Sequence, residues 1–380
     1  MAYGDIGAAE DTFEFELTDI TRPEMIHISG DIYAIAFTDV SGYGQVVTID
    51  ITEAGAIGAA VKGSLEFDGA AGGDPAIIHI AGSVYAIAYK NSTNDGVVLT
   101  LTISDNGETL ALTGQSVAFE ETYGAQPDMV HVSGIVYAIA YTGAGNNGFI
   151  AAVNISDNGL TLSKIGVSLE YDEDDGKEPS LIHVSGDVFA IAHTGAGNNG
   201  VITTVTVSGA GVIALVAGGS LEFDGADGND SCMVRVATGI FAIAYRSTGD
   251  VGIVKTVSIS GAGAIALIAG GSLEFDGTKC THPDIILLNK GICAIAYAGD
   301  GDDGYVCTIQ VNEDGTVDDP ILDVREHDLQ NGGQPSIVRV LGDQYAIAYI
   351  GLGLDGFVDT PTIETPRAGG IKYGLLMGIG

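Results

Sequence analysis

The chain has 380 residues, with 50 Asp and Glu against 14 Lys and Arg, and it contains 57 Gly. Its formal charge of −36 argues against nucleic-acid partners and anionic membrane surfaces, because both are bound through clustered Lys and Arg. A hydrophobic fraction of 46% allows a large core and excludes a disordered acidic tail. We expect no membrane-spanning segment and no classical secretory signal.

A strict repeat follows the first residues of the chain. The tripeptide Ala-Ile-Ala begins at residues 34, 86, 138, 190, 242, 294 and 346, so every interval is 52 residues. An uninterrupted repeat of this kind leaves no room for a second domain. We therefore predict an N-terminal extension over residues 1–11, a repeat domain over residues 12–365 and an apolar C-terminal tail over residues 366–380.

The unit around Ala138 shows what each repeat contains. In chain order, residues 116–120, 127–132, 136–141 and 149–155 are rich in Val, Ile and aromatic side chains, and polar or glycine-containing segments separate them. No segment shows the apolar period of 3.6 that is typical of an amphipathic helix. Short strands at this spacing predict four strands per repeat and an all-β fold.

The seven units resemble the blades of seven-bladed β-propellers, such as the WD40 and YVTN-type families. Thr12–Glu16 matches Ser64–Asp68, whereas no such segment follows the inner strands of the last unit. The resemblance implies that the N-terminal strand completes the last blade. Residues 371–380 overlap the same slot and compete for it. The WD dipeptide and the kelch glycine pair are absent, so no family function is transferred. A linear β-solenoid is the alternative fold.

Glycine recurs at one position in every unit, just before the third predicted strand. We expect these glycines to adopt a positive φ as the chain leaves a loop. They are Gly44, Gly96, Gly148, Gly200, Gly252, Gly304 and Gly356.

The loops before these glycines vary in sequence from unit to unit and carry Asn or Asp. Variable loops on a rigid scaffold indicate a recognition face, which these loops would share with the connections between blades. The candidate recognition residues are Asp95, Asn147, Asn199, Asp250, Asp303 and Asp355.

Calcium is the one cofactor that the sequence suggests. Asp300, Asp302 and Asp303 offer oxygen ligands of the kind that Ca²⁺ prefers, but their spacing is one residue short of the EF-hand-like pattern. Asx turns, in which the same side chains bond to the local backbone, are the alternative interpretation.

One position on the predicted inner strand carries basic or imidazole side chains, which would form a layer around a central channel. We interpret this channel layer either as an anion or water site or as a set of bonds to the next blade. Its members are His27, His79, His131, His183, Arg235 and Arg339.

Catalysis would require a break in the repeat that brings a nucleophile, a base and an orienting group together. His193 and His327 replace aromatic residues, and Cys280 lies two residues before His282. None of these departures forms a triad or a carboxylate pair. We therefore assign no catalytic residue and expect that the protein is not an enzyme, with hydrolase or lyase activity as the least favoured alternative. The four cysteines lack metal or redox spacing and are predicted to be free thiols, with one disulfide as the alternative.

The C-terminal tail is the candidate assembly segment, because its apolar residues lie outside the repeat pattern. These residues are Ile371, Leu375, Leu376, Met377 and Ile379. The sequence thus favours a non-enzymatic structural or attachment propeller in a larger assembly, such as a virion or an extracellular surface structure. The alternative is a soluble or cell-surface propeller that binds a protein or a glycan, with or without calcium. The expected partners are a protein assembly, a glycan surface, or a second copy bound through the tail.

Overall fold

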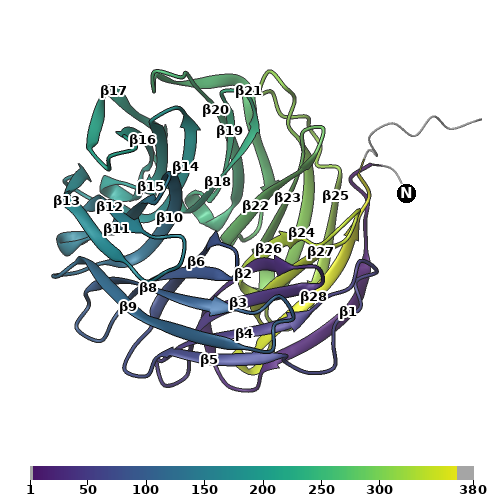
Figure 1. The fold of residues 1–380 in the computed structure, drawn as a ribbon. Coiled ribbons are helices and arrows are strands. Elements are labelled where there is room, and N and C mark those ends of the chain that lie inside the picture. The colour runs from purple at the N-terminus through teal and green to yellow at the C-terminus, as the bar shows by residue number, and fades with distance from the viewer. Residues whose placement is uncertain (1–2, 366–380) are drawn as a thin grey trace, which may run out of the picture.

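The computed structural model describes residues 3–365, and over this range the chain folds as a seven-bladed β-propeller. Seven antiparallel four-stranded sheets stand around a central axis, as Figure 1 shows. The prediction of an all-β ring of four-stranded repeats is therefore confirmed.

The strands follow the same order in each blade, from the axis to the rim. The innermost strands are β2 (Ile20–Ser29), β6 (Gly73–Ala81), β10 (Ala125–Ser133), β14 (Lys177–Ser185), β18 (Asn229–Ala237), β22 (Thr281–Asn289) and β26 (Gly333–Arg339). The second strands are β3 (Ile32–Asp39), β7 (Val84–Lys90), β11 (Val136–Thr142), β15 (Val188–Thr194), β19 (Ile240–Arg246), β23 (Ile292–Ala298) and β27 (Tyr345–Ile350).

The third strands are β4 (Gly44–Asp50), β8 (Gly96–Ile103), β12 (Gly148–Ile155), β16 (Gly200–Val207), β20 (Gly252–Ile259), β24 (Gly304–Gln310) and β28 (Gly356–Ile363). The outer strands are β5 (Gly63–Asp68), β9 (Leu110–Glu120), β13 (Leu162–Asp172), β17 (Ile213–Asp224), β21 (Ile265–Asp276), β25 (Asp323–Asp328) and β1 (Ile6–Glu16). Short 3-10 turns join second and third strands at η1 (Ala144–Asn146), η2 (Ala196–Asn198), η3 (Thr248–Asp250), η4 (Asp300–Asp302) and η5 (Leu352–Leu354).

The N-terminal strand closes the ring, as the sequence implied. β1 pairs antiparallel with β28, with Thr12 opposite Asp359 and Glu14 opposite Phe357. Figure 1 shows the purple strand β1 beside the yellow strand β28 at the rim of the last blade. Because β1 begins at Ile6, part of the predicted extension belongs to this blade. β1 therefore fills the slot for which the tail was a competitor, and the tail itself lies outside the described residues.

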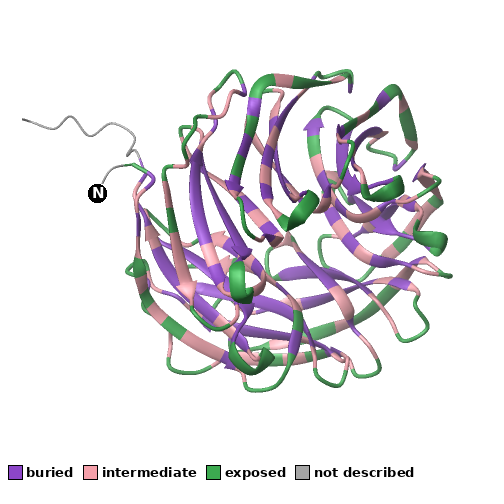
Figure 2. Ribbon diagram, turned by 180° about the vertical axis from the view of Figure 1, so that it is seen from behind, coloured by how far each residue is buried: buried purple, intermediate pink, exposed green. Residues whose placement is uncertain are grey.

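The core lies between neighbouring blades and is built on the Ala-Ile-Ala strands. In β11, Ala138, Ile139 and Ala140 are fully buried, because both faces of this strand pack against other blades. Figure 2 shows this pattern, with buried strands and exposed loops and short 3-10 turns. In five blades a tyrosine follows the motif, and it is tied to the end of the outer strand of the preceding blade, as when Tyr89 donates to Asp68 at 2.9 Å. Small alanines thus allow close blade packing, and the tyrosines join the layers.

The recurring glycine is required by an aromatic ring and not by a positive φ, so our expectation was wrong. None of the seven adopts a left-handed conformation. A Cβ atom at each of these positions would lie only 2.1 to 2.7 Å from the ring of an outer-strand residue, such as Phe223 above Gly200. The positive φ lies two residues earlier, as at Asn198 with φ 68°. The glycine makes room for the aromatic side chain that seals each blade.

We expect Gly200→Ala to destabilise the fold by roughly 1 to 3 kcal/mol, because the added methyl group would collide with an aromatic ring that is already in contact with the glycine. The nearest atom of the Phe223 ring would lie 2.2 Å from the new Cβ. Gly209→Ala is the matched control, since the Cβ there would meet Ser133 at an ordinary 3.6 Å. Denaturant unfolding of both variants tests the assignment. Equal stability of the two variants would show that ring contact is not why glycine recurs.

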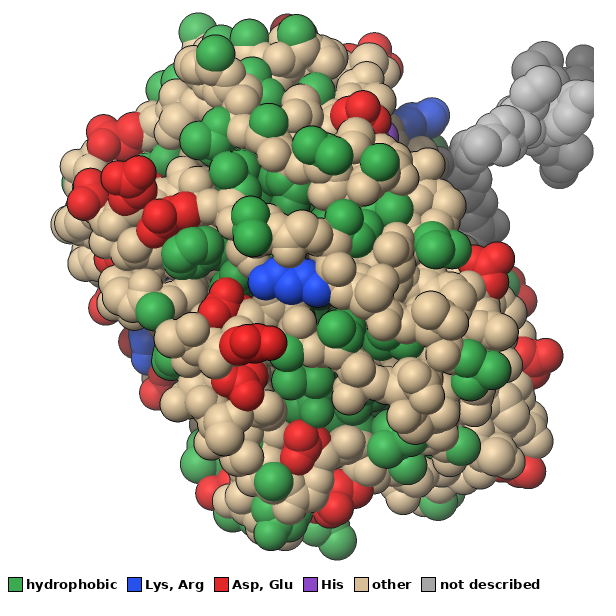
Figure 3. All heavy atoms as spheres, turned by 60° about the vertical axis from the view of Figure 1, so that its left-hand side comes forward, with side chains coloured by type: hydrophobic (Ala, Val, Ile, Leu, Met, Phe, Trp, Pro, Cys, Tyr) green, Lys and Arg blue, Asp and Glu red, His purple; other side chains and the backbone are tan. Residues whose placement is uncertain are grey.

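The rim of the ring exposes apolar side chains on the long outer strands. Val167 on β13 is 88% exposed, and Leu215 on β17 is 50% exposed. Figure 3 brings this side forward and shows hydrophobic side chains spread over a largely uncharged surface, with groups of Asp and Glu side chains beside them. No helix within residues 3–365 is long and apolar enough to cross a membrane. All four cysteines are free; Cys280, Cys293 and Cys307 are buried, and burial raises the pKa of each of these thiols.

Candidate functional site

A pocket of about 550 Å³ opens where the innermost strands begin, at the central axis. We call this side of the ring the pocket face. It also carries the loops between second and third strands, such as residues 91–95, and the connections between blades, such as residues 121–124. Hydrogen bonds tie the two loop types together, as when Gly124 N–H donates to the Asn94 carbonyl at 2.9 Å. The predicted variable loops therefore surround the mouth of this pocket.

The upper ring of the pocket is formed by the residue before each recurring proline, or before Ser231 in the fifth blade. Its members are Arg22, Asp74, Gln126, Glu178, Asp230, His282 and Gln334. All of them have a positive φ, between 47° and 53°. At the same point in each blade the register of the first two strands shifts, for example between Gly73 and Ala76 of β6. A β-bulge of this kind redirects a side chain, and here it places one polar side chain per blade around the axis.

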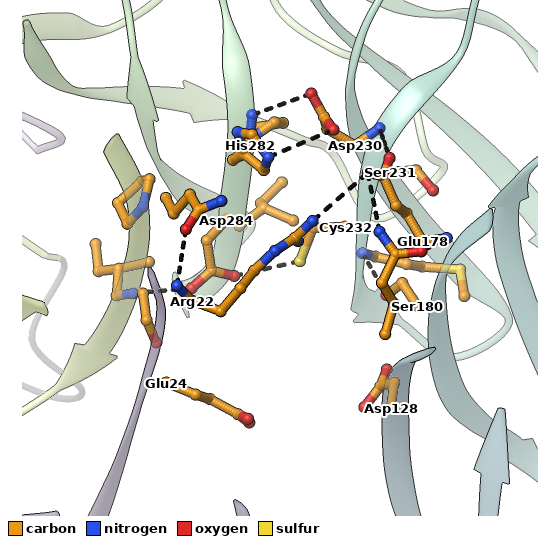
Figure 4. Close-up of a pocket in the computed structure, with 18 of the residues that line it drawn as sticks. Arg22, Glu24, Asp128, Glu178, Ser180, Asp230, Ser231, Cys232, His282 and Asp284 are labelled. Atoms are coloured by element: carbon orange, nitrogen blue, oxygen red, sulfur yellow. Dashed lines mark hydrogen bonds and ion pairs between the residues drawn. The ribbon is translucent and has the colours of Figure 1, made fainter. Parts of the chain in front are cut away.

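Charges in the upper ring are partly compensated. Arg22 reaches across the pocket, with its guanidinium 3.7 Å from Asp74 and 3.7 Å from Glu178. Asp230 pairs with Arg246 at 3.0 Å, and His282 Nε2 lies 3.8 Å from Asp230. Figure 4 shows Arg22 extended toward the opposite wall, with Glu178 and Asp230 on that side. The ring thus mixes both signs of charge, with carboxylates in excess.

The lower ring lies two residues further along the strands. Its members are Glu24, Ala76, Asp128, Ser180, Cys232, Asp284 and Ser336, and all of them except Ala76 line the pocket. Most of these side chains join neighbouring blades by accepting a hydrogen bond from a backbone N–H of the next inner strand. Glu24 accepts from Ile77 at 3.0 Å, Asp128 from Leu181 at 2.6 Å and Asp284 from Ile337 at 2.8 Å. The serines do the same at Met233 and Met25, both at 3.1 Å.

Burial changes the acidity of the pocket carboxyl groups. It raises the pKa of Glu24 to about 8, with a further contribution from the Asp128 charge. Burial also raises the pKa of Asp128 to about 6 and that of Glu178 to about 7. Asp230 is the exception: burial raises its pKa, but His282 and Arg246 outweigh that effect and leave it below its usual value. The lower ring is therefore the part of the pocket where negative charge is most costly.

The predicted channel layer occupies equivalent positions at the other end of the innermost strands. His27, His79, His131 and His183 are exposed, and each ring Nε2–H donates to the glycine carbonyl of its own turn at 2.8 to 2.9 Å. Only Arg235 bonds to another blade, at the His183 carbonyl, while Arg339 donates to Gly342 of its own blade. The blade-to-blade bond that we considered thus exists for Arg235 and not for the histidines.

The candidate recognition residues lie on the pocket face, but most of their side chains turn back toward their own blade. Asn147 donates to Glu170 at 2.5 Å and Asn199 donates to Glu222 at 2.8 Å. Asp95 accepts from Thr93 at 2.6 Å. The half-buried members are Asp95, Asn147, Asn199, Asp303 and Asp355, and Asp250 is exposed beside Arg246. These residues shape the loops, while their neighbours provide the outermost atoms of the face.

The suggested calcium ligands lie in η4 and the residue that follows it. Asp302 forms an ion pair with Lys279. Within residues 3–365, no three His, Cys, Asp or Glu side chains are grouped as a metal site requires. Calcium binding by Asp300, Asp302 and Asp303 stays a prediction. The assembly residues Ile371, Leu375, Leu376, Met377 and Ile379 lie outside the described residues.

The departures from the repeat are separated in space rather than gathered into one centre. His193 takes the place of a tyrosine and bonds to Asp172 of the preceding blade at 3.1 Å, as the tyrosines of other blades bond to the acid at the equivalent position. His327 is buried at the closing seam, with Nδ1 3.0 Å from Asp359. Of the Cys280 and His282 pair, only His282 reaches the pocket.

Neither pocket ring was predicted, although the sequence carries one signal of them. Six blades have proline at the start of the inner strand, and the residue before it varies among Arg, Asp, Gln, Glu and His at a fixed spacing of 52. Chemical variety at one repeat position is what a non-symmetric site requires. The alternation of apolar and polar residues along a regular strand could not reveal the rings, because a β-bulge sets the direction of these side chains.

Comparison with known proteins supports the fold alone. No model of a known protein family matches the sequence, and no curated protein matches it. A fungal alcohol oxidase in complex with copper is similar in structure, with a TM-score of 0.60 and 10% identity over 94% of this chain and 77% of that one. A putative 6-phosphogluconolactonase from Bacteroides fragilis gives 0.58 and 13% identity over 91% and 97%. A protein of unknown function from Dyadobacter fermentans gives 0.52 and 11% over 93% and 98%.

Proposed function

We propose that the protein is a non-enzymatic attachment propeller, which presents its pocket face for recognition within a larger assembly such as a virion or an extracellular surface structure. The observation that carries this proposal is the convergence of the variable loops of the blades on one face of a rigid ring. Loops held on a rigid scaffold are the usual place for recognition.

The charge of this face favours a cationic partner, or a glycan reached through a bound cation. Acidic residues of its loops include Asp95, Glu121, Glu173, Asp174, Asp227, Asp250, Asp300, Asp302, Asp303 and Asp355. Lys279 is the basic residue of the same loops, and it is paired with Asp302. A field of one sign steers oppositely charged partners and is sensitive to salt.

Two observations support a structural role over catalysis. The lower-ring carboxylates of Glu24, Asp128 and Asp284 are engaged in bonds between blades, so they act in holding the ring. Exposed apolar residues on the rim, such as Val167 and Leu215, are suited to packing against other subunits of an assembly.

Two measurements on the full chain test this proposal. Light scattering should give a mass above the 38.7 kDa of one chain, because an assembly protein associates. A glycan array, read with and without EDTA, and a poly-lysine surface test recognition. We expect binding to weaken severalfold in a Glu173→Gln/Asp174→Asn variant, since both side chains are exposed on the pocket face.

A variant with the same change in charge on the opposite face is the control. Asp105→Asn/Glu108→Gln removes two exposed carboxylates from the loop between β8 and β9 and should bind like the unmodified chain. A monomer that binds neither probe, or equal losses in both variants, would contradict recognition by the pocket face. Loss of glycan binding with EDTA would favour the calcium-dependent alternative.

A further inference from the structure

We propose that the central pocket binds a small aliphatic diamine, whose ammonium groups are held by the carboxyl groups of the lower ring. This inference concerns the interior of the ring and is independent of recognition by the loops. It rests on the size of the pocket, on carboxyl groups that have no cationic partner, and on one buried hydroxyl group that has no hydrogen-bond partner.

The pocket has room for a small organic molecule. Its volume of about 550 Å³ lies in the range of small-molecule sites. Its walls alternate between polar and apolar side chains along the strands. The prolines separate the two polar rings, and aliphatic residues follow the lower ring. The aliphatic residues that line the pocket are Leu181, Ile182, Ile285, Ile286, Ile337 and Val338. A short hydrocarbon chain with polar ends matches this alternation.

The lower ring lacks a cation of its own. Glu24, Asp128 and Asp284 form no ion pair with a Lys, Arg or His side chain within residues 3–365. Arg22 is close by, but its guanidinium pairs with Asp74 and Glu178 of the upper ring. In Figure 4 the carboxyl groups of Glu24 and Asp128 project from opposite walls beneath Arg22, with open space between them. Buried carboxylates without a counter-charge are unfavourable, so a ligand that supplies positive charge gains affinity there.

Ser231 gives the second and independent observation. It stands where the other blades have proline, it is only 7% exposed, and it lines the pocket. Its Oγ atom has no hydrogen-bond partner among the described residues. A buried hydroxyl without a partner is unfavourable, and a ligand that donates a hydrogen bond to it would remove that cost. An ammonium group has three donors and no acceptor, so it can bond to a carboxylate and to this hydroxyl together.

The spacing of the acidic groups favours an amine over a metal ion. A metal ion would need three or more ligands at one point, and no such group exists in residues 3–365. Carboxyl groups spread around a ring instead suit a ligand that carries two separate charges. A diamine with a short aliphatic chain meets this requirement, and its methylene groups would pack on the prolines.

Titration calorimetry of the full chain with 1,4-diaminobutane tests the proposal, with 1,4-butanediol as the uncharged analogue of similar shape. We expect binding of the diamine and none of the diol. Glu24→Gln/Asp128→Asn should lower the affinity at least tenfold, because neither side chain can then ionise to pair with the bound ammonium groups. Gln and Asn keep a carbonyl oxygen for the N–H groups of Ile77 and Leu181, so the ring remains joined. Asp105→Asn/Glu108→Gln, on the opposite face, should leave the affinity unchanged.

Ser231→Pro gives a second variant that does not depend on the lower ring. It restores the residue found in the other blades and removes the unpartnered hydroxyl, so we expect a severalfold loss of affinity. The proposal is overturned if millimolar diamine neither gives a binding signal nor raises the melting temperature. It is also overturned if the diol or CaCl₂ binds and the diamine does not, or if neither pocket variant changes the affinity.

Discussion

Deletion of residues 1–18 should leave the propeller largely unfolded at room temperature, because it opens the ring. β1 contributes the whole outer strand of the last blade, and its ladder with β28 runs from Ile6 opposite Ile363 to Glu16 opposite Gly356. Phe15 is 5% exposed and packs on Phe37 with ring centres 5.5 Å apart. Removal of one buried Phe side chain alone costs about 3 to 5 kcal/mol, a large part of the 5 to 15 kcal/mol that holds a typical protein folded.

The polar contacts of β1 add to this effect. Thr12 Oγ1 donates to Asp359 at 2.6 Å, and Thr360 Oγ1 donates to the Asp11 carbonyl at 3.2 Å. Asp359 is only 1% exposed, so loss of a donor leaves a buried carboxylate less well satisfied. Circular dichroism and thermal melting of the truncated chain would measure the loss. Phe15→Ala should give a smaller but large loss, and Leu17→Ala, at a site that is 74% exposed, should be nearly neutral.

A circular permutant separates closure from simple loss of sequence. Gly4 N–H donates to the Glu364 carbonyl at 2.8 Å, so residues 3–17 can be attached after Thr365 through a short glycine linker. This permutant should be as stable as a chain that ends at Thr365 with its N-terminus intact. If the permutant is as unstable as the deletion, or if the deletion melts like the full chain, closure by β1 is not what stabilises the ring.

The architecture could be predicted because a strict period repeats the same physical demands in every blade. Seven copies of Ala-Ile-Ala define a strand buried on both faces, and the unmatched Thr12–Glu16 segment defines the closure. The role of the recurring glycine could not be predicted in the same way. Its partner ring, such as Phe223 for Gly200, lies 23 residues away, and their contact depends on the register of β16 and β17.

The candidate site was less predictable than the fold, and the bulges explain why. In a regular strand, Arg22 and Glu24 would lie on one face together with every second residue. Nothing in the sequence of a single unit indicates that these two side chains point to the central axis. The bulge between Thr21 and Glu24 directs both side chains into the pocket. By contrast, His27 stands out in the sequence because it recurs, yet it lies beyond the bulge and bonds to Gly30 of its own turn. Recurrence identifies what every blade needs, while a binding site depends on what differs between blades.

Glu24→Gln should stabilise the protein increasingly as the pH rises from 5.5 to 8.5. Burial and the Asp128 charge raise the pKa of Glu24 to about 8 in the folded chain, from 4.5 when unperturbed. Between pH 4.5 and pH 8 the folded state therefore binds more protons than the unfolded state. The free energy of unfolding falls as the pH rises through this range. Gln cannot ionise, so it avoids this loss while its carbonyl oxygen still accepts from Ile77.

The expected size follows from the width of this pH window. Each pKa unit corresponds to about 1.4 kcal/mol, so the advantage of Gln over Glu should grow by roughly 3 kcal/mol between pH 5.5 and pH 8. The pKa values of Asp128 and Glu178 are raised to about 6 and about 7, so these groups also lower the free energy of unfolding as the pH rises, and they do so equally in both proteins. Burial lowers the pKa of His282, so this group raises the free energy of unfolding as the pH rises toward 6.5, again in both proteins. The difference between the two proteins thus isolates Glu24.

Urea unfolding of both proteins at half-unit steps of pH would measure this difference. Glu108→Gln is the control, because Glu108 is exposed on the opposite face and its replacement should shift stability little at any pH. A constant difference between Glu24→Gln and the unmodified chain across the range would mean that Glu24 is not held protonated by its surroundings. The lower ring would then be better hydrated than its burial indicates, and the blade-to-blade bond to Ile77 would be formed by a carboxylate at every pH above 5.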